Sequence, residues 1–329
     1  MRAFVYTNYG SPDVLRCEEV PVPTPGDGEV LVRIRAASAN PMDYGLMGGV
    51  YLLRLMTGLR KPKPTRPGAD LAGEVEAVGK NVTRFQPGDP VFGAARGAFA
   101  EYACAPEDKL ATKPANITFE QAATIPVAGS TALQGLRDKG RVQPGQRVLI
   151  NGAAGGVGTF AVQIAKAFGA DVTGVCSPKS VDLVRSLGAD HVVDYTRDDV
   201  TRSADRYDLI FDCVGNRPLT AWRRVMAPGG TFVPIGARPG GHWIGPLPYL
   251  LRLLVSSWFM GQKRAFFMAK ISTADLTVLK ELIEAKKVTP VVDRRYEFRE
   301  AAEALRYLKE GHARGKVVIA MEHNGRPEK

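Results

Sequence analysis

The chain has 329 residues, of which 45% are hydrophobic and 24% charged, and its mean hydropathy is −0.11. This length excludes a peptide hormone or a disulfide miniprotein, and the composition excludes a disordered protein and supports one large domain or two ordinary ones. Lys and Arg outnumber Asp and Glu by 44 to 34, so the net charge is +10, which favours phosphorylated or polyanionic partners.

The cysteine usage predicts a cytoplasmic protein. The four cysteines are far apart in the sequence and form neither a CxxC motif nor a cluster with histidine, which is typical of a reducing compartment. The N-terminal segment MRAFVYTNYG lacks the apolar core of a signal peptide. The most apolar segment, residues 243–260, is interrupted by Pro and Arg, so we expect no membrane span.

Residues 1–122 consist of short apolar segments separated by Pro and Gly. Apolar and charged residues alternate only in part between Val30 and Arg35. The β-branched content and the regular turn signals predict an all-β, barrel-like unit. Its expected strands are MRAFVYT, LRCEEVPVP, EVLVRIRAAS, DLAGEVEAVG, PVFG and FAEYACA.

The pattern changes near Thr118, a candidate helix N-cap with Glu120 in the following turn. Strands and helices then alternate, which predicts an α/β fold with a doubly wound parallel sheet and a ligand at the carboxyl ends of its strands. The expected strands are 147–150, 172–175, 191–194, 208–214 and 231–235, with helices over 157–168, 180–187 and 218–226. A sixth strand is expected at 264–270, followed by helices over 276–287 and 299–311 and strands over 288–296 and 316–321.

The cofactor motif is residues 145–166, GQRVLINGAAGGVGTFAVQIAK, in which Gly152, Gly155 and Gly158 are spaced three residues apart. The first glycine allows a tight turn, the second lets the backbone approach a pyrophosphate, and the third lets the helix pack closely on the sheet. The helix N-terminus adds free N–H groups and about half a positive charge. Because the motif follows an apolar strand and opens an amphipathic helix, it predicts a dinucleotide site rather than a plain connection.

This segment resembles the signature of the quinone oxidoreductase and ζ-crystallin branch of the medium-chain dehydrogenases/reductases. The resemblance covers essentially the whole chain: GDGEVLVRIRAASANPMDYGLMGG and PGADLAGEVEAVGKNVTRFQPGDPVFG are similar to the family's GroES-like domain, and LGADHVVDY, FDCVG, GGTFVPIG and GHARGKVVI follow in the family's order. It implies a GroES-like β-barrel catalytic domain of residues 1–122 and 272–329, and a Rossmann NADPH-binding domain of residues 123–271.

The residues after the second Rossmann strand favour NADPH over NADH. NAD-selective sites place an acidic side chain about 20 residues beyond the glycine turn. Here that region holds Cys176, Ser177 and Lys179, and the hydroxyl and ammonium suit a 2′-phosphate. The resemblance implies the same role for Ser177, Lys179 and Tyr195. Alternatively, Lys179 is a solvated loop residue, and Ser177 or Ser180 is a helix cap.

By the same resemblance, other residues of the matched blocks contact the cofactor. Those of the glycine turn are Gly152, Ala154, Gly155, Gly156, Val157 and Gly158. Those of the three later blocks are Val214, Ile235, Gly236 and Lys316.

The zinc ligands of the family's metalloenzymes are replaced in this chain. By the resemblance, Asn40 stands where zinc-dependent relatives have a cysteine ligand, and Gly68-Ala69-Asp70 replaces the segment that carries a histidine. The segment between Pro90 and Glu101 is too short for the structural zinc lobe and has no cysteine, and the four histidines are scattered. We therefore expect no metal.

Without a Lewis acid, a conjugated or quinoid carbonyl is the favoured substrate, because charge delocalises onto its oxygen when hydride arrives. The resemblance implies hydride transfer from NADPH to a quinone or an α,β-unsaturated carbonyl compound. Asn40 and Asp43 match polar positions of the family's cleft, which implies amide or oxyanion hydrogen bonding for Asn40 and a water-borne proton relay or an orienting role for Asp43. The alternative for Asn40 is that it shapes a turn before Pro41.

A second hypothesis is a nucleic-acid-binding or membrane-surface protein with vestigial catalysis. It rests on the net charge and on a basic run without an intervening acid, formed by Arg54, Arg60, Lys61, Lys63 and Arg66. That run lacks the interleaved aromatic residues of proteins that bind single strands, so a solvated loop explains it more simply. We expect no nucleic-acid partner.

The sixth strand predicts a homodimer. An apolar outer strand is an aggregation hazard unless it is paired or covered. The resemblance implies that the same edge in two subunits pairs about a twofold axis. The candidate contacts are Trp258, Phe259, Phe266 and Phe267. In the alternative, residues 243–260 cover this edge in a monomer.

Overall fold

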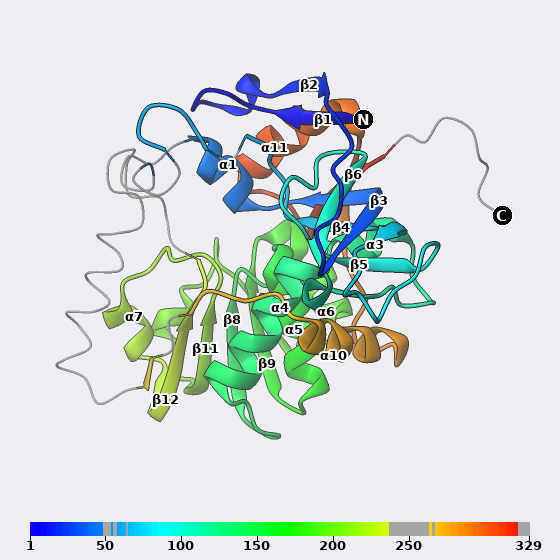
Figure 1. Ribbon diagram of the computed structural model, residues 1–329. Coiled ribbons are helices and arrows are strands. Elements are labelled where there is room, and N and C mark those ends of the chain that lie inside the picture. The colour runs from blue at the N-terminus through cyan, green and yellow to red at the C-terminus, as the bar shows by residue number, and fades with distance from the viewer. Residues whose placement is uncertain (49–53, 55–57, 64, 237–262, 265–266, 322–329) are drawn as a thin grey trace. The chain divides into compact units, whose positions relative to one another are not determined.

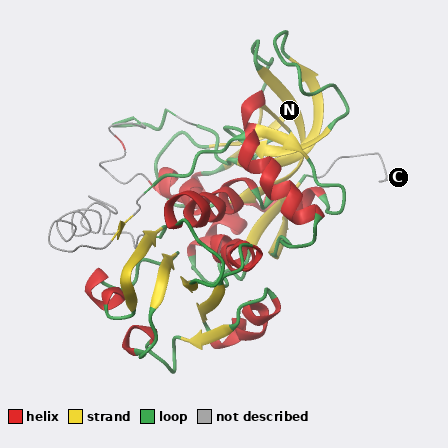
Figure 2. Cartoon of the chain, turned by 90° about the horizontal axis from the view of Figure 1, so that it is seen from below, coloured by secondary structure: helices red, strands yellow, loops and turns green. Residues whose placement is uncertain are grey.

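The computed structural model describes the chain except for residues 49–53, 55–57, 64, 237–262, 265–266 and 322–329. The chain forms two compact units. The first comprises Met1–Val127, Ile271–Glu284 and Pro290–Lys329, and the second comprises Ala128–Lys270 and Ala285–Thr289. Figure 1 traces both units in chain order, and Figure 2 distinguishes their strands from their helices by colour.

The first unit is built around a mostly antiparallel sheet. Its strand order is β14-β15-β3-β4-β5-β7, with β6 paired to β3 and a separate β1-β2 hairpin. The strands are β1 (Arg2–Val5), β2 (Arg16–Glu19), β3 (Glu29–Ala39), β4 (Asp70–Val78), β5 (Pro90–Ala94), β6 (Tyr102–Pro106), β7 (Leu110–Thr112), β14 (Val292–Glu297) and β15 (Lys316–Ala320).

Strand β3 explains the partial alternation of its sequence. It pairs with β4, β6 and β15, and its last four residues, Ala36 to Ala39, are all buried. A strand covered on both faces needs apolar or small residues at consecutive positions, so only its first half alternates. Helices α1 (Pro41–Gly48), α3 (Phe119–Ala123), α10 (Thr273–Glu284) and α11 (Ala301–Lys309) complete the unit.

The second unit confirms the α/β, doubly wound prediction. Its sheet has the order β10-β9-β8-β11-β12-β13, and every neighbouring pair is parallel. The chain runs outward from β8 through β9 to β10, then returns to β11 beside β8, so the topological switch point lies between β8 and β11. The strands are β8 (Arg147–Asn151), β9 (Asp171–Cys176), β10 (His191–Asp194), β11 (Tyr207–Asp212), β12 (Met226–Pro234) and β13 (Lys263–Arg264).

Two of the three helices predicted for the second unit begin and end within one residue of their expected ranges, and the third, expected over 218–226, covers only Leu219–Arg223. Helix α5 (Gly156–Ala167) is followed by Gly169 with φ +80°, a left-handed conformation that ends a helix at little cost for glycine. Helices α6 (Val181–Ser186) and α7 (Leu219–Arg223) connect the later strands. Thr118 and Gln121 form a capping box before α3, and α4 (Pro126–Gln134) follows.

Several other predictions differ from the structure. The helix expected over 276–287 is α10 at Thr273–Glu284, and the one expected over 299–311 is α11 at Ala301–Lys309. The sixth strand is β13 at Lys263–Arg264, whereas residues 267–270 have no regular structure. The strand expected from 288 begins only at Val292, because Pro290 lacks the N–H that a ladder requires. Pro41 is the first residue of α1 rather than part of a turn, a position where its missing N–H costs nothing.

Two further expectations concern the whole chain. All four cysteines are free thiols. Among the helices of the described residues, none has the length and apolarity that a membrane span requires.

Candidate functional site

The glycine turn of the second unit has the geometry that a dinucleotide requires. Gly152 has φ +82°, and a Cβ at Gly158 would lie 2.1 Å from the carbonyl oxygen of Gly152. Gly155 precedes α5 as its N-cap, and a Cβ there would meet only the Gly152 oxygen, at 3.5 Å. The turn therefore closes tightly at Gly152 and Gly158 and leaves open space at Gly155.

The fit to a dinucleotide follows from this space and from the helix behind it. The first N–H groups of α5, from Gly156, Val157 and Gly158, have no partner within the helix and carry its positive dipole end. A pyrophosphate is the group that such a turn accommodates. Ala154 is buried within the turn.

The carboxyl ends of the other strands place the remaining predicted cofactor residues, except Lys316, in the same unit. Ser177 follows β9 and Tyr195 follows β10, and the Tyr195 N–H donates to Cys176 O at 3.2 Å. Lys179 is exposed in the 3₁₀ turn Pro178–Ser180, which follows Ser177. Tyr195 also lines a cavity of about 50 Å³ together with Asn151 and Trp222. Ser177 and Tyr195 therefore lie at the carboxyl ends of neighbouring strands of the parallel sheet.

The structure does not support the alternative in which the side chain of Ser177 or Ser180 caps a helix. Ser177 and Ser180 occupy the positions before a 3₁₀ turn and before α6, but neither side chain makes a capping hydrogen bond. Their hydroxyl oxygens instead lie 3.2 Å apart.

On the other side of the switch point, the ends of β11 and β12 are tied together. Ile235 and Gly236 both donate their N–H groups to Asp212 O, at 2.8 and 3.0 Å. A Cβ at Gly236 would lie 2.2 Å from Cys213 O, and one at Gly152 would lie 2.7 Å from Val214 Cγ2. Val214 thus borders the glycine turn, and Ile235 and Gly236 lie beside the end of β11. Their contact with the cofactor stays a prediction.

Asn151 and Asp212 join the two strands at the switch point itself, and the sequence analysis did not single them out. Asn151 Nδ2 donates to Asp212 Oδ1 at 2.8 Å, and the same oxygen accepts the N–H groups of Val214 and Gly215 at 3.0 Å each. Asp212 is fully buried, and its Oδ2 has no hydrogen-bond partner in the described part of the chain. A polar residue closing an otherwise apolar strand, as in RVLIN and DLIFD, was the available signal.

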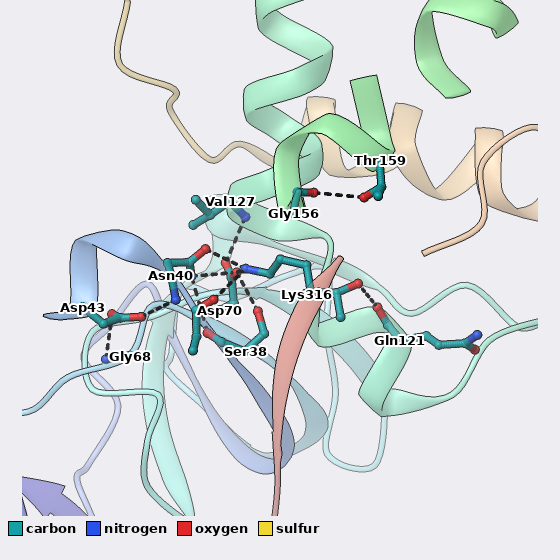
Figure 3. Close-up of polar contacts among 12 residues, drawn as sticks. Ser38, Asn40, Asp43, Gly68, Asp70, Gln121, Val127, Gly156, Thr159 and Lys316 are labelled. Atoms are coloured by element: carbon teal, nitrogen blue, oxygen red, sulfur yellow. Dashed lines mark hydrogen bonds and ion pairs between the residues drawn. The ribbon is translucent and has the colours of Figure 1, made fainter. Parts of the chain in front are cut away.

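In the first unit, Asn40 belongs to a buried polar cluster that we call the Asp70 cluster: Ser38, Asn40, Asp43, Asp70 and Lys316 (Figure 3). Asn40 Nδ2 donates to Asp70 Oδ2 at 2.9 Å and to Ser38 O at 3.4 Å. Asn40 Oδ1 accepts from Lys316 Nζ at 2.6 Å. The amide orientation follows from its neighbours, because an NH₂ group facing the ammonium would place two donors together.

Asp43 lies one helical turn beyond Asn40 and binds backbone N–H groups. Its Oδ2 accepts the N–H of Asn40 at 2.8 Å, which is the back-bond of a helix N-terminus, and its Oδ1 accepts the N–H of Gly68 at 3.2 Å. Burial raises the pKa of Asp43 to about 7; Asp70 adds to the increase, whereas the two backbone bonds and Lys316 oppose it. A buried carboxyl with this pKa can hold or release a proton near neutral pH.

Lys316 was predicted to contact the cofactor, and the structure places it in the Asp70 cluster. Its side chain is buried, and Nζ donates to Ala39 O at 3.1 Å, to Asn40 Oδ1 at 2.6 Å and to Asp70 Oδ2 at 3.2 Å. An ammonium has three N–H donors, so these contacts use all of them. A hydrogen bond from Lys316 Nζ to the cofactor would have to replace or share one of these bonds, and the predicted contact stays a prediction.

No metal ligand set is assembled in the part of the chain that the structure describes. There, no group of three or more His, Cys, Asp or Glu side chains is placed to hold a metal ion.

Comparison with known proteins agrees with both units. Residues 26–115 match the alcohol dehydrogenase GroES-like domain, and residues 187–319 match the domain described as zinc-binding dehydrogenase. A chloroplastic quinone-oxidoreductase of Triphysaria versicolor is 32% identical over 97% of this chain and 98% of its own length. The chloroplastic NADPH-dependent alkenal/one oxidoreductase of Arabidopsis thaliana is 35% identical over 97% of this chain and 79% of its own length.

A solved structure extends the comparison to the fold. Escherichia coli quinone oxidoreductase complexed with NADPH matches with a TM-score of 0.80 and 25% identity, over 97% of this chain and 100% of that one. The fold and the glycine turn thus define an oxidoreductase with a GroES-like and a Rossmann-type unit. The chain belongs to the medium-chain dehydrogenase/reductase family, in the branch that contains the quinone oxidoreductases.

Proposed function

We propose that the protein is a zinc-independent oxidoreductase that transfers hydride from NADPH to a quinone or an α,β-unsaturated carbonyl compound. The observation that carries this proposal is the full-length similarity to relatives named as quinone and alkenal/one oxidoreductases. The geometry of the second unit supports it, because the predicted cofactor residues after β8, β9, β10, β11 and β12 gather at the carboxyl ends of one parallel sheet.

The residues that would hold NADPH fall into three groups, according to the part of the cofactor that each would contact. The open position at Gly155 and the N-terminus of α5 would receive the pyrophosphate. Lys179, with Ser177 and Tyr195, would bind the 2′-phosphate by charge-assisted hydrogen bonds. Val214 and Gly236 would border the nicotinamide half. NADPH bound there supplies the hydride and the reducing equivalents.

Zinc independence rests on the residues that replace the ligands. Asn40 stands in the position of a cysteine ligand, and its amide is committed to Asp70 and Lys316. The Lys316 ammonium beside Asn40 Oδ1 repels a second cation, so this amide is a poor metal ligand. A conjugated acceptor needs less electrophilic help than a plain ketone, because its developing charge is delocalised, so this substrate class suits the site.

We assign Asn40 to hydrogen bonding with substrate or cofactor and Asp43 to proton supply. Asp43 is the described carboxyl of this cluster whose pKa is raised toward neutrality. Water in contact with it would be reprotonated as the reduced product takes up its proton. Both backbone donors to Asp43 favour its charged form and thereby keep its pKa from rising further.

We also propose a homodimer in the cytoplasm. In the part of the chain that the structure describes, β13 is the outermost strand of the second sheet, and its outer edge is the surface that a second subunit would pair with. Phe267 also contacts its own chain, because its ring centroid lies 5.8 Å from Lys139 Nζ and its Cζ would lie 3.3 Å from a Cβ placed on Gly135. Its side chain is only half-buried, so its contact with a second subunit stays a prediction. Trp258, Phe259, Phe266 and the covering segment 243–260 lie outside the described residues. The four free thiols support a reducing compartment.

The deciding experiment is a screen of NADPH oxidation over quinones, enones and aldehydes, with and without chelator. We expect turnover with quinones or enones that survives EDTA. Absence of turnover with any acceptor, together with a salt-sensitive mobility shift with RNA, would favour the nucleic-acid hypothesis instead.

A further inference from the structure

Asp70 is the most heavily bonded side chain of the Asp70 cluster. It is fully buried at the start of β4, and Oδ2 accepts from Ser38 Oγ at 2.9 Å, Asn40 Nδ2 at 2.9 Å and Lys316 Nζ at 3.2 Å. Oδ1 accepts the N–H of Val127, in the first turn of α4, at 2.9 Å. Four donors from three segments of the first unit, the end of β3, the start of α4 and β15, therefore converge on one carboxylate.

We propose that Asp70 is a positioning residue for Asn40, and that it holds the amide so that the carbonyl oxygen is the group left for a ligand. Both hydrogens of Asn40 Nδ2 point into the protein, toward Asp70 Oδ2 and Ser38 O. One lone pair of Asn40 Oδ1 faces Lys316, and a carbonyl oxygen has two. The inference rests on the proposed function where it takes Asn40 as the residue that meets substrate or cofactor.

This arrangement selects the chemistry that Asn40 offers. With its N–H groups used, the amide accepts a hydrogen bond rather than donating one, so its partner is a donor such as a primary carboxamide or a phenolic hydroxyl. An oxyanion, which needs donors, is not matched by Asn40 in this orientation. Of the two roles first expected for Asn40, the structure favours amide hydrogen bonding.

Asp70 and Lys316 also act in opposite directions on Asp43. The negative charge of Asp70 raises the pKa of Asp43 and the positive charge of Lys316 lowers it. Among the described residues, Tyr6 is a further titratable group on which the charge of Asp43 acts. Burial together with the charges of Tyr9 and Asp43 raises the pKa of Tyr6 to about 12, so it stays neutral at working pH. Burial is the main cause of the raised pKa of Asp43, and the charged pair that orients Asn40 adjusts that pKa in opposite directions.

A double-mutant cycle between Asn40→Ala and Asp70→Asn tests the proposal through kcat/KM. If Asp70 acts through Asn40, kcat/KM falls about tenfold or more in each single variant. In the double variant, kcat/KM is then at most about threefold lower than in the less active single variant. If the two losses multiply, Asp70 has only a structural role and the proposal is overturned.

A second readout needs no cofactor. The pH dependence of the melting temperature reports the titration of Asp43, and we expect its midpoint to move down in Asp70→Asn and up in Lys316→Met. Shifts in the same direction, or none, would contradict the proposal. Because this measurement uses the protein alone, it stands even if the wild type turns over no acceptor, which would refute the proposed function separately.

Folding of the variants is controlled in two ways. Asp70→Asn leaves Lys316 as an unpaired buried charge, which can prevent folding. The Asp70→Asn/Lys316→Met variant removes both charges, so it should fold and should still lose at least tenfold in kcat/KM, whereas wild-type activity in it would overturn the proposal. Asp190→Asn is the matched control, because Asp190 also pairs with a lysine, Lys166, and accepts a backbone N–H, but lies outside the Asp70 cluster. It should change neither kcat/KM nor the pH midpoint.

Discussion

Replacing Asp43 with Asn should stabilise the protein at high pH and not at low pH. The carboxyl of Asp43 has a pKa of about 7 in the folded protein, against 3.8 for an ordinary aspartate. In the unfolded chain it ionises at the lower value, whereas the folded protein keeps it neutral until about pH 7. Its contribution to stability is therefore complete below pH 3.8, falls as the pH rises, and is lost by about pH 7.

The size of the effect follows from the interval. One pKa unit corresponds to about 1.4 kcal/mol, so the change between pH 5 and pH 7 is about 3 kcal/mol. For a unit of this size, about 3 kcal/mol corresponds to roughly 6 to 12 °C in melting temperature. Asparagine cannot ionise, and it loses one acceptor toward the N–H of Asn40 or Gly68, which costs about 1 kcal/mol at every pH.

The assay is the melting temperature of wild type and Asp43→Asn from pH 5 to pH 8, without cofactor. We expect the melting temperature of the variant, relative to that of the wild type, to rise by roughly 6 to 12 °C between pH 5 and pH 8. Asp190→Asn serves as the control and should show a constant difference, because the bonds to Lys166 and Val172 hold the pKa of Asp190 below its ordinary value, outside this range. A constant difference for Asp43→Asn as well would refute a neutral Asp43 at pH 5 to 7.

Three further expectations concern the cofactor, the metal and the assembly. NADPH should bind much more tightly than NADH, and Lys179→Ala should reduce the ratio of the two affinities by about ten- to a hundredfold. Ser177→Ala should reduce that ratio less, and equal affinities in the wild type would contradict a 2′-phosphate site at these residues. Activity should survive EDTA with substoichiometric zinc by elemental analysis, and loss on chelation restored by zinc would show that Asn40 does not mark a missing ligand set. Light scattering at micromolar concentration should give twice the mass of one chain, and a monomeric wild type would exclude the dimer. The Arg264→Pro substitution within β13 should shift the measured mass toward that of a single chain, because proline removes a ladder donor.

The parallel sheet could be predicted from the sequence because each of its elements carries a local signal. The strand ahead of Gly152, the glycine spacing and Gly169 at the end of α5 are all short-range features, and the structure confirms the elements they indicate. The outer strand was misplaced because apolar residues such as Phe267 satisfy a strand pattern equally well when they pack against a helix of the same chain. Periodicity records burial and does not distinguish the two.

The predicted cofactor residues at the carboxyl ends of the parallel strands and the residues of the Asp70 cluster differ in how far their grouping could be predicted from the sequence. Residues after parallel strands converge by topology, so Ser177, Tyr195 and Val214 could be grouped in advance. The Asp70 cluster depends on contacts between β3, β4 and β15, which are more than 200 residues apart at their extremes, as the separation of 246 positions between Asp70 and Lys316 shows. No local pattern predicts that pairing, and a charged residue opening an apolar strand was its only trace.

The glycine turn allows binding and folding to be separated by two matched substitutions. In Gly158→Ala the new Cβ would lie 2.1 Å from Gly152 O and 2.8 Å from Ala153 C, both backbone atoms that cannot move cheaply, so the melting temperature should fall. In Gly155→Ala the new Cβ has an ordinary 3.5 Å contact, and φ is −79°, which any residue adopts. Its melting temperature should stay within about 1 °C, while its methyl group occupies the space left for the pyrophosphate and weakens NADPH binding about tenfold or more. Calorimetric titration with NADPH measures the second effect. Unchanged NADPH affinity in a folded Gly155→Ala protein would show that the phosphates do not approach the backbone at this turn.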